Sequence, residues 1–359
     1  MLRSVYRRVA AHCKVTNPPL RDTAIMTKTP MGVGVIGAGK HGQRYIQHIA
    51  RDVPALRLVA VSRQNAVAGR EQAAALGVRF HPEWQALVAD PDVQAVVVVV
   101  PPTLHAPIVE AVAGAGKALL IEKPLAPTGA AAIAIRDTIQ RRGIPALMAH
   151  TLRWNSMVTA VRNHLPGLGA LRALAVNQRF EPSALQWLDA PAVSGGGIIL
   201  HTGVHSLDLV RFLTGCEVTR VICRTARSVT RASEDNFVAV LELEGSNALV
   251  TASGSRATAG RSGLIDLAAA EGQLVGDHQL HYGYTSRGVE RTPLPLPEPT
   301  MTVRAVLESF VALVERGTVP PARIEDGVRA VQIAEACIRS AATGGAVEVE
   351  PLPSSWSPS

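Results

Sequence analysis

The chain from residue 32 alternates short apolar runs with segments in which apolar residues recur at helical spacing. The apolar runs are GVGVIG, LRLVAVS, AVVVVVP, ALLIEKP and IPALMAH. Between them, the pattern predicts helices from about residue 42, through REQAAALG, over 105–115 and over 130–142. Strands that alternate with helices form βαβ units and a doubly wound parallel sheet. We therefore predict an α/β domain over 31–150.

The pattern changes after residue 150. One apolar helix is predicted over 198–214, and the strand-like runs that follow are VTRVICRTA, NFVAVLELE, ALVTASGSR and LIDLAAAEGQLVG. Consecutive strands joined by Gly and Asn, as in LEGSNAL, favour a mainly antiparallel sheet. Helical segments over 301–316 and 324–343 close the chain. This predicts a second α/β domain over 151–359.

Composition and charge indicate a globular protein that binds a small molecule. With 47% hydrophobic and 18% charged residues, the chain has a globular composition. The net charge of +7 comes from arginines that are scattered through the sequence, so we expect an anionic small molecule as partner and no nucleic acid. The longest apolar run, AVVVVV, is too short to span a membrane. Four cysteines without metal or disulfide spacing favour the cytoplasm.

The first 30 residues stand apart from this pattern. Residues 1–21 contain no acid and place arginines on an amphipathic pattern, which resembles a transit peptide. Met26 and Met31 offer later start sites. We favour a disordered extension or a start-site artefact over 1–30.

The first strand is followed by a glycine-rich turn, GAGKHG, with Gly37, Gly39 and Gly42 in a GxGxxG frame around Lys40 and His41. A strand before this motif and a helix after it form the context of dinucleotide binding. Gly37 permits the tight turn, Gly39 lets the backbone approach a pyrophosphate, and Gly42 allows close helix packing. The sequence therefore predicts a nicotinamide dinucleotide site.

The end of the second strand indicates which dinucleotide is bound. An NAD-preferring site carries an acid about 20 residues after the glycines. Here the chain reads VAVSRQN, and residues 57–70 contain no Asp or Glu. Ser62 and Arg63 can donate to a 2′-phosphate, which favours NADP(H), with NAD(H) as the alternative. Arg63 as a solvated loop residue is the other interpretation.

Candidate chemistry follows the predicted strand ALLIE. Glu122 and Lys123 stand at its carboxyl end, the edge at which ligands bind in open α/β sheets. A lysine there can polarise or protonate an oxygen, and burial lowers its pKa toward the working range. A simple Lys–Glu salt bridge is the alternative.

A polar stripe runs along the otherwise apolar helix predicted over 198–214. At about 100° per residue, His201, His205, Asp208 and Phe212 fall within roughly 60° of one another. Buried polar groups need hydrogen-bond partners, so the stripe belongs either to a hydrogen-bond network within the protein or to a pocket that holds water or a ligand. Histidines four residues apart can share a zinc ion, but no third ligand is apparent, and we predict no metal.

Three motifs together resemble the glucose-fructose oxidoreductase, inositol dehydrogenase and MocA (Gfo/Idh/MocA) family: GAGKHG, PPTLHAPIVEAVAGAGKALLIEKPLA, and GGGIILHTGVHSLDLVRFLTG. The resemblance covers nearly all of the chain from residue 32. It implies an N-terminal Rossmann domain and a C-terminal α/β domain with a large open sheet used for homo-oligomer contacts, as a dimer or tetramer. It also implies NAD(P)-dependent chemistry on sugars, cyclitols or related polyols.

The resemblance also implies roles for individual residues. Lys123 and His205 match the family's catalytic lysine and histidine, whereas His201 replaces its usual aspartate. His205 would donate or accept the hydroxyl proton, and Lys123 would hold and polarise that oxygen. His201 would bind a hydroxyl, or the substrate would be anionic. Asp208 would orient His205 or bind substrate, with a plain helix contact as the alternative.

Further candidates lie at the ends of the third and last Rossmann strands and beyond. Pro101, Thr103, His105, Glu122 and Lys123 are expected to touch the cofactor. Arg153 and Trp154 are expected to line the substrate site, with interdomain packing as the alternative, and Arg179 faces either the site or water.

Two other functions stay open: an NAD-dependent glycosidase that cleaves by elimination, and a nucleotide-binding sensor without catalysis.

Overall fold

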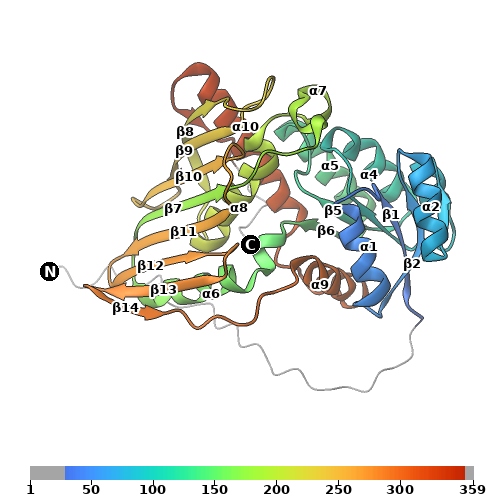
Figure 1. Cartoon of the computed structure of the whole chain (residues 1–359), viewed down its shortest axis with the longest axis horizontal. Helices are drawn as coiled ribbons and strands as arrows, with labels where there is room; N and C mark the ends of the chain where they lie inside the picture. Colours follow the sequence, from blue (N-terminus) through green and yellow to red (C-terminus); the bar gives the residue numbers. More distant parts are fainter. Residues whose placement is uncertain (1–28, 352–359) are drawn as a thin grey trace.

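The computed structural model describes residues 29–351 of the 359-residue chain. Two β-sheets lie side by side and are joined by helices (Figure 1). The prediction for the N-terminal extension falls outside the described residues, except at positions 29 and 30. Within residues 29–351, no helix is long and apolar enough to cross a membrane.

The first sheet has six parallel strands in the order β3-β2-β1-β4-β5-β6. Its strands are β1 (Met31–Ile36), β2 (Leu56–Ser62), β3 (Arg79–His81), β4 (Ala95–Val98), β5 (Ala118–Glu122) and β6 (Ala146–Ala149). Its helices are α1 (Gly42–Arg51), α2 (Ala66–Leu76), α3 (Trp84–Ala89), α4 (His105–Gly114) and α5 (Gly129–Arg142). This is the strand order of the Rossmann fold, so the doubly wound prediction is confirmed. The short elements β3 and α3 were not predicted.

The central strands of this sheet are apolar because both of their faces are covered. Helices α4 and α5 cover one face with residues such as Ile108 and Ile135. On the other face, Tyr45 and Ile46 of α1 pack beside Phe310. All residues of β1, β4 and β5 are consequently buried.

The second sheet has nine strands in the order β14-β13-β12-β11-β7-β10-β9-β8-β15. Its strands are β7 (Leu171–Arg179), β8 (Val218–Ala226), β9 (Asn236–Leu243), β10 (Leu249–Ser255), β11 (Ser262–Ala269), β12 (Gly272–Asp277), β13 (Tyr282–Arg287), β14 (Glu290–Pro293) and β15 (Val347–Glu348). Neighbouring strands are antiparallel except β7 and β10, which run parallel. The mainly antiparallel prediction is confirmed, although β7, β13, β14 and β15 were not predicted.

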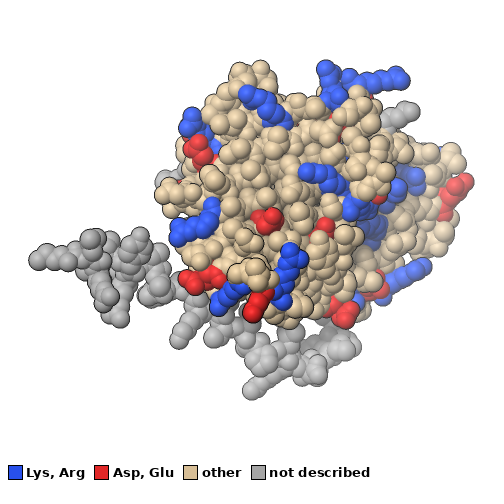
Figure 2. All heavy atoms as spheres, turned by 60° about the vertical axis from the view of Figure 1, so that its left-hand side comes forward, with Lys and Arg blue, Asp and Glu red and all other residues tan. Residues whose placement is uncertain are grey.

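Helices cover one face of the nine-stranded sheet. The helices after β6 are α6 (Ser156–His164), α7 (Pro191–Ser194), α8 (Val204–Thr214), α9 (Thr302–Arg316) and α10 (Ile324–Thr343). In β9, Phe237, Ala239 and Leu241 face the core with α8, whereas Val238 and Val240 are exposed. On the face shown in Figure 2, Lys and Arg stand singly among acidic and uncharged residues, so no basic stripe forms there.

Helices α9 and α10 tie the two sheets together. Although the sequence places them after the second sheet, Phe310 of α9 and Val328 of α10 are buried against the first sheet. Further along α10, Ile333 and Cys337 belong to the core of the second sheet. This crossing fixes the carboxyl end of β5 against the beginning of α8, where the candidate site lies.

Candidate active site

The glycine turn is shaped by close backbone contacts. Gly37 has φ +93°, and its amide donates to the Ser62 carbonyl at 2.9 Å. A Cβ at Gly42 would lie 2.1 Å from the Gly37 oxygen, whereas one at Gly39 would meet nothing within 4 Å. The turn therefore packs tightly on its inner side and borders open space at Gly39, which fits a pyrophosphate at the beginning of α1.

Glu122 connects the end of β5 to α1. Its Oε1 accepts hydrogen bonds from Tyr45 Oη at 2.6 Å and His41 Nε2 at 2.7 Å, and its Oε2 accepts from the Lys123 amide at 3.0 Å. Burial of Glu122 opposes ionisation, but the nearby His41 and Lys123 charges and these hydrogen bonds lower its pKa to about 2. Glu122 is thus an anchored carboxylate, and Tyr45 is a partner that sequence analysis missed.

Lys123 reaches from the first sheet to the beginning of α8. Its Nζ donates to the main-chain oxygen of His201 at 2.8 Å. Burial, and then the charge of Arg256, lower the pKa of Lys123, while Glu122 raises it. Burial and the Lys123 charge also lower the pKa of both imidazoles, to about 3 for His201. The structure therefore brings Lys123, His201 and His205 together, with both histidines neutral at pH 7.

The predicted polar stripe does not continue as a regular α-helix. Residues Ile199–Gly203 form a π-helical turn before α8, so the assumed 100° spacing is wrong at His201. The His201 ring meets Trp187 edge-on at 5.6 Å between ring centroids, and the His205 ring meets His150 at 6.3 Å. The two rings therefore have different aromatic neighbours.

Several imidazole nitrogens at this place lack partners in the described part of the chain, among them both ring nitrogens of His150, which packs against His205. His201 Nε2 and His205 Nδ1 are buried and form no hydrogen bond within residues 29–351. A buried polar atom without a partner is costly unless another molecule supplies one. These nitrogens, beside the Lys123 ammonium, form a site suited to hydroxyl groups.

Asp208, the acidic residue of the predicted stripe, belongs to a buried network of charged side chains. Asp208 accepts from Arg153 Nε at 3.0 Å and from Arg153 Nη2 at 2.7 Å, and Arg153 also pairs with Asp326 at 3.0 Å. Trp154 Nε1 donates to Ser309 Oγ of α9 at 2.7 Å. The polar groups of Arg153, Trp154 and Asp208 are thus engaged within the protein, which favours packing over substrate contact.

Residues after β4 are likewise engaged internally. His105 is fully buried, with Nδ1 3.0 Å from the Leu125 oxygen and Nε2 3.1 Å from the Val100 oxygen. Thr103 Oγ1 donates to the Val193 oxygen at 3.0 Å, and Pro101 is half-buried beside it. Of these three residues, His105 is enclosed by the protein, whereas Pro101 and Thr103 keep accessible surface that could border a cofactor.

Arg256 and Trp187 are site residues that sequence analysis missed. Arg256 follows β10, and its Nε donates to Thr202 Oγ1 at 3.0 Å. Arg179, which sequence analysis left between site and water, is half-buried and donates to Ser253 Oγ at 3.0 Å. Neither Arg256 nor Trp187 lies in a recognisable motif, because only the sheet and the 181–194 loop bring them to His201.

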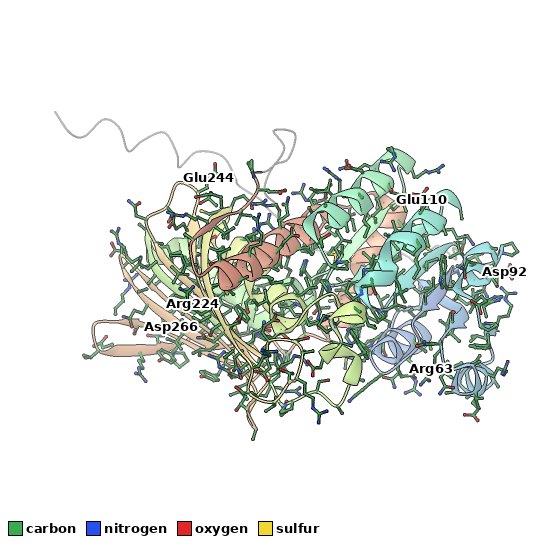
Figure 3. All side chains as sticks on the ribbon, turned by 90° about the horizontal axis from the view of Figure 1, so that it is seen from above. Arg63, Asp92, Glu110, Arg224, Glu244 and Asp266 are labelled. Atoms are coloured by element: carbon green, nitrogen blue, oxygen red, sulfur yellow. The ribbon has the colours of Figure 1, made fainter. Side chains whose placement is uncertain are left out.

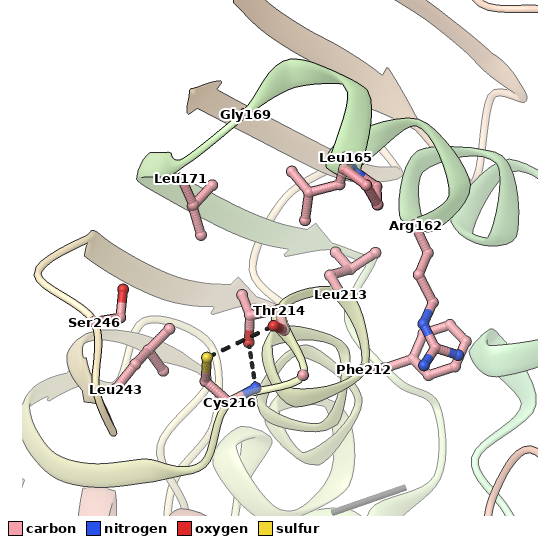
Figure 4. A pocket seen from close by; sticks show the side chains of 12 residues that line it. Arg162, Leu165, Gly169, Leu171, Phe212, Leu213, Thr214, Cys216, Leu243 and Ser246 are labelled. Atoms are coloured by element: carbon pink, nitrogen blue, oxygen red, sulfur yellow. Dashed lines mark hydrogen bonds between the residues drawn. The ribbon is translucent and has the colours of Figure 1, made fainter. Parts of the chain in front are cut away.

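A surface hollow of about 390 Å³ lies away from this site, between α6, the end of α8 and β9 (Figure 4). Its polar contacts are local, since Cys216 bonds only to Thr214. None of the predicted site residues lines it.

Within residues 29–351, no group of three or more His, Cys, Asp or Glu is arranged to hold a metal ion.

Comparison with known proteins places this geometry in a family. Residues 31–150 match the model of an oxidoreductase family with an NAD-binding Rossmann fold, and residues 167–276 match the GFO/IDH/MocA C-terminal domain. Inositol 2-dehydrogenase 2 of Saccharopolyspora erythraea is 30% identical, covering 91% of this chain and 98% of that protein. An inositol 2-dehydrogenase of Rhizobium meliloti is 27% identical, covering 86% and 96%.

Solved structures show the same fold. The aldose-aldose oxidoreductase of Caulobacter crescentus, solved with glycerol, has a TM-score of 0.81 at 22% identity and covers 89% of this chain and 99% of its own. Levoglucosan dehydrogenase with NADH and levoglucosan has a TM-score of 0.79 at 21% identity and covers 90% and 100%. The resemblance that the motifs suggested is confirmed: the chain belongs to the Gfo/Idh/MocA family of NAD-binding oxidoreductases.

Proposed function

We propose that this oxidoreductase acts on a hydroxyl-bearing carbon of a sugar, cyclitol or related polyol, with NAD(P) as the redox partner. The observation that carries the proposal is the hydrogen bond from Lys123 Nζ to the His201 carbonyl, on the segment that also carries the unpartnered nitrogens His201 Nε2 and His205 Nδ1. The names of the inositol 2-dehydrogenase relatives agree with such a substrate. When bound, the nicotinamide supplies the hydride acceptor or donor.

Each side chain of the site has its own role in binding the substrate or transferring its proton. Lys123 Nζ uses one of its three hydrogens on the His201 oxygen and keeps two for a substrate oxygen. His205, neutral because burial lowers its pKa, can accept the hydroxyl proton during oxidation and return it during reduction. His201 Nε2 is left for a neighbouring hydroxyl. Glu122 holds the end of β5 in place through His41 and Tyr45.

A panel assay tests this proposal. Sugars, cyclitols and sugar phosphates are incubated with NAD⁺ or NADP⁺ at alkaline pH, and cofactor reduction is followed by absorbance. Stoichiometric reduction supports a dehydrogenase. Cleavage of a glycoside with catalytic cofactor and no net absorbance change would instead establish the glycosidase, and tight cofactor binding without turnover would establish the sensor.

We propose further that NADP(H) is preferred, because the end of β2 offers cations and no acid to the ribose. Arg63 lies at the Rossmann end of the molecule, far from Arg224 and Asp266 of the second sheet (Figure 3). Its Nη1 makes one long hydrogen bond, 3.4 Å, to Gln72 Oε1 of α2. A bond of that length is easily exchanged for a phosphate oxygen.

Arg63→Ala is expected to weaken NADPH binding by about tenfold or more and NADH binding by about twofold or less, because one charge-assisted hydrogen bond is lost. Fluorescence titration of the two reduced nucleotides measures this ratio. Arg70→Ala is the matched control, since Arg70 is an exposed α2 residue lying over the Phe80 ring. Equal weakening of both nucleotides by Arg63→Ala would remove the claim.

We also propose a homo-oligomer, a dimer or tetramer, through the uncovered face of the second sheet. Ile222, Val238 and Val240 on this face are 42%, 49% and 44% exposed. Adjacent exposed apolar side chains on β8 and β9 are typical of an interface.

Cys216, Cys223 and Cys337 are free thiols, which supports a reducing compartment such as the cytoplasm.

Val240→Asp is expected to shift the protein toward monomers, because a carboxylate would be buried without a partner in the interface. Sedimentation velocity at a series of concentrations measures the change. Val289→Asp, in the exposed β13–β14 turn, should leave the assembly unchanged. An unaltered oligomer in Val240→Asp would argue against this face.

A further inference from the structure

Arg256 is held in place by contacts at both of its ends. Its amide donates to the Asp235 oxygen at 2.9 Å, and its Nε donates to Thr202 Oγ1 at 3.0 Å. Thr202 directly follows His201, whose carbonyl binds Lys123. The guanidinium therefore lies beside the residues proposed to bind substrate, on the side of the second sheet.

No carboxylate of residues 29–351 neutralises the charge of Arg256. Within residues 29–351, its Nη1 and Nη2 have no hydrogen-bond partner, and no carboxylate lies within 4 Å. The more deeply buried Arg153, Arg211 and Arg329 all have carboxylate partners. Arg261, which shares the Phe180 ring with Arg256, is paired with Glu181 at 2.8 Å.

The neighbourhood of Arg256 adds positive charge. Thr202, which binds Arg256, and His201, whose carbonyl binds Lys123, are adjacent in the chain, and the charge of Arg256 lowers the pKa of Lys123 and of His201. The Glu122 carboxylate binds Tyr45 and His41 and makes no contact with Arg256 within residues 29–351. Because position 201 carries an imidazole, the beginning of α8 supplies no carboxylate to balance Arg256. A neutral polyol would leave this guanidinium unpaired in a half-buried place.

We infer that the substrate is an anionic sugar or polyol, whose carboxylate or phosphate is bound by the terminal nitrogens of Arg256 while its reacting hydroxyl lies at Lys123 and His205. The planar fork of a guanidinium matches both anions in a bidentate pair. This inference rests on the proposed dehydrogenase function and adds the class of substrate. Arg256 is thus a specificity-determining residue rather than a catalytic one.

Substrates matched in ring structure and different in charge test the inference. D-glucose, D-glucuronate and D-glucose 6-phosphate are compared as substrates for the full-length protein, with myo-inositol as a neutral cyclitol. The wild-type protein is expected to favour one anion over glucose by about tenfold or more in kcat/KM. The glucuronate and phosphate arms tell a carboxylate from a phosphate. Arg256→Gln should remove that preference, measured as the ratio of kcat/KM for the anion to kcat/KM for glucose in the same variant.

Two further variants separate recognition from folding. Arg256→Lys keeps the charge and is expected to retain part of the preference, because a point charge replaces the bidentate fork. Arg261→Gln removes an arginine on the same ring that Glu181 already neutralises, and it should keep the wild-type preference. Cooperative thermal unfolding of each variant shows that it is folded.

Calorimetry measures how tightly each of these compounds binds to the NADPH-loaded protein, and it tests the anion site even if no compound is turned over. Absence of cofactor reduction with every compound would refute the proposed dehydrogenase, yet tighter binding of an anion than of glucose, lost in Arg256→Gln, would still support the anion site. If neither anion binds or reacts better than glucose, or if Arg256→Gln leaves the preference intact, the inference is overturned.

Discussion

Replacing Lys123 by methionine is expected to lower kcat/KM by about a thousandfold, because the substrate oxygen loses both its hydrogen-bond donor and the nearby positive charge. Methionine has similar length and fills the half-buried space. Nucleotide affinity should stay within about threefold of the wild-type value, since the main-chain contact of Lys123 with Glu122 remains. Steady-state kinetics and nucleotide titration of the same preparation measure both quantities.

Lys117→Met is the matched control. Lys117 directly precedes β5, whereas Lys123 directly follows it, and its Nζ likewise donates to a main-chain oxygen, that of Asp90 at 2.6 Å. Loss of Lys117 should leave kcat/KM nearly unchanged. If Lys123→Met retains more than about a tenth of wild-type kcat/KM, the role proposed for this ammonium is wrong.

Asp208→Asn is expected to lower the free energy of unfolding by about 3–5 kcal/mol, because it leaves the buried Arg153 guanidinium without its bidentate partner. Asp326 remains beside Arg153 but also pairs with Arg211. Urea denaturation followed by circular dichroism measures the loss. Removing both charges, in Arg153→Met with Asp208→Leu, should restore part of the stability.

An exposed ion pair provides the comparison. Glu308→Gln breaks the contact of Glu308 with Arg304 on the surface of α9 and should cost less than about 1 kcal/mol. A similarly small effect of Asp208→Asn on stability, combined with a large rise in KM, would instead place Asp208 in contact with substrate.

The alternation of apolar runs and helical segments was enough to predict most of the first sheet. A strand such as β4, covered on both faces, is marked by a run of valines that no solvent-facing position interrupts. The short β3 was missed because three residues carry too little pattern. In the second sheet, β7 was missed because its uncovered face holds alanines and polar residues beside its apolar core positions.

The candidate site was predictable where chemistry coincides with a motif. The glycine turn, Lys123 and His205 each lie in a short run whose spacing is informative. In the structure, His41 of the turn bonds to Glu122, and the neighbouring Lys123 bonds to the His201 carbonyl, four residues before His205. The roles of Arg153 and Asp208 could not be decided, because Arg153 lies 55 residues from Asp208 and more than 100 residues from its other partner, Asp326. The position of His201 depended on a π-helical turn that residue periodicity does not reveal.

Local periodicity and motif spacing were enough to predict the two-sheet architecture, the glycine turn and the presence of a lysine and two histidines. Which charges neutralise one another became clear only in the folded chain. Arg153 and Arg256 look alike in the sequence, yet one lies between two buried aspartates and the other faces the site without a carboxylate. Electrostatic pairing acts over a few ångströms in space, and the fold sets those distances.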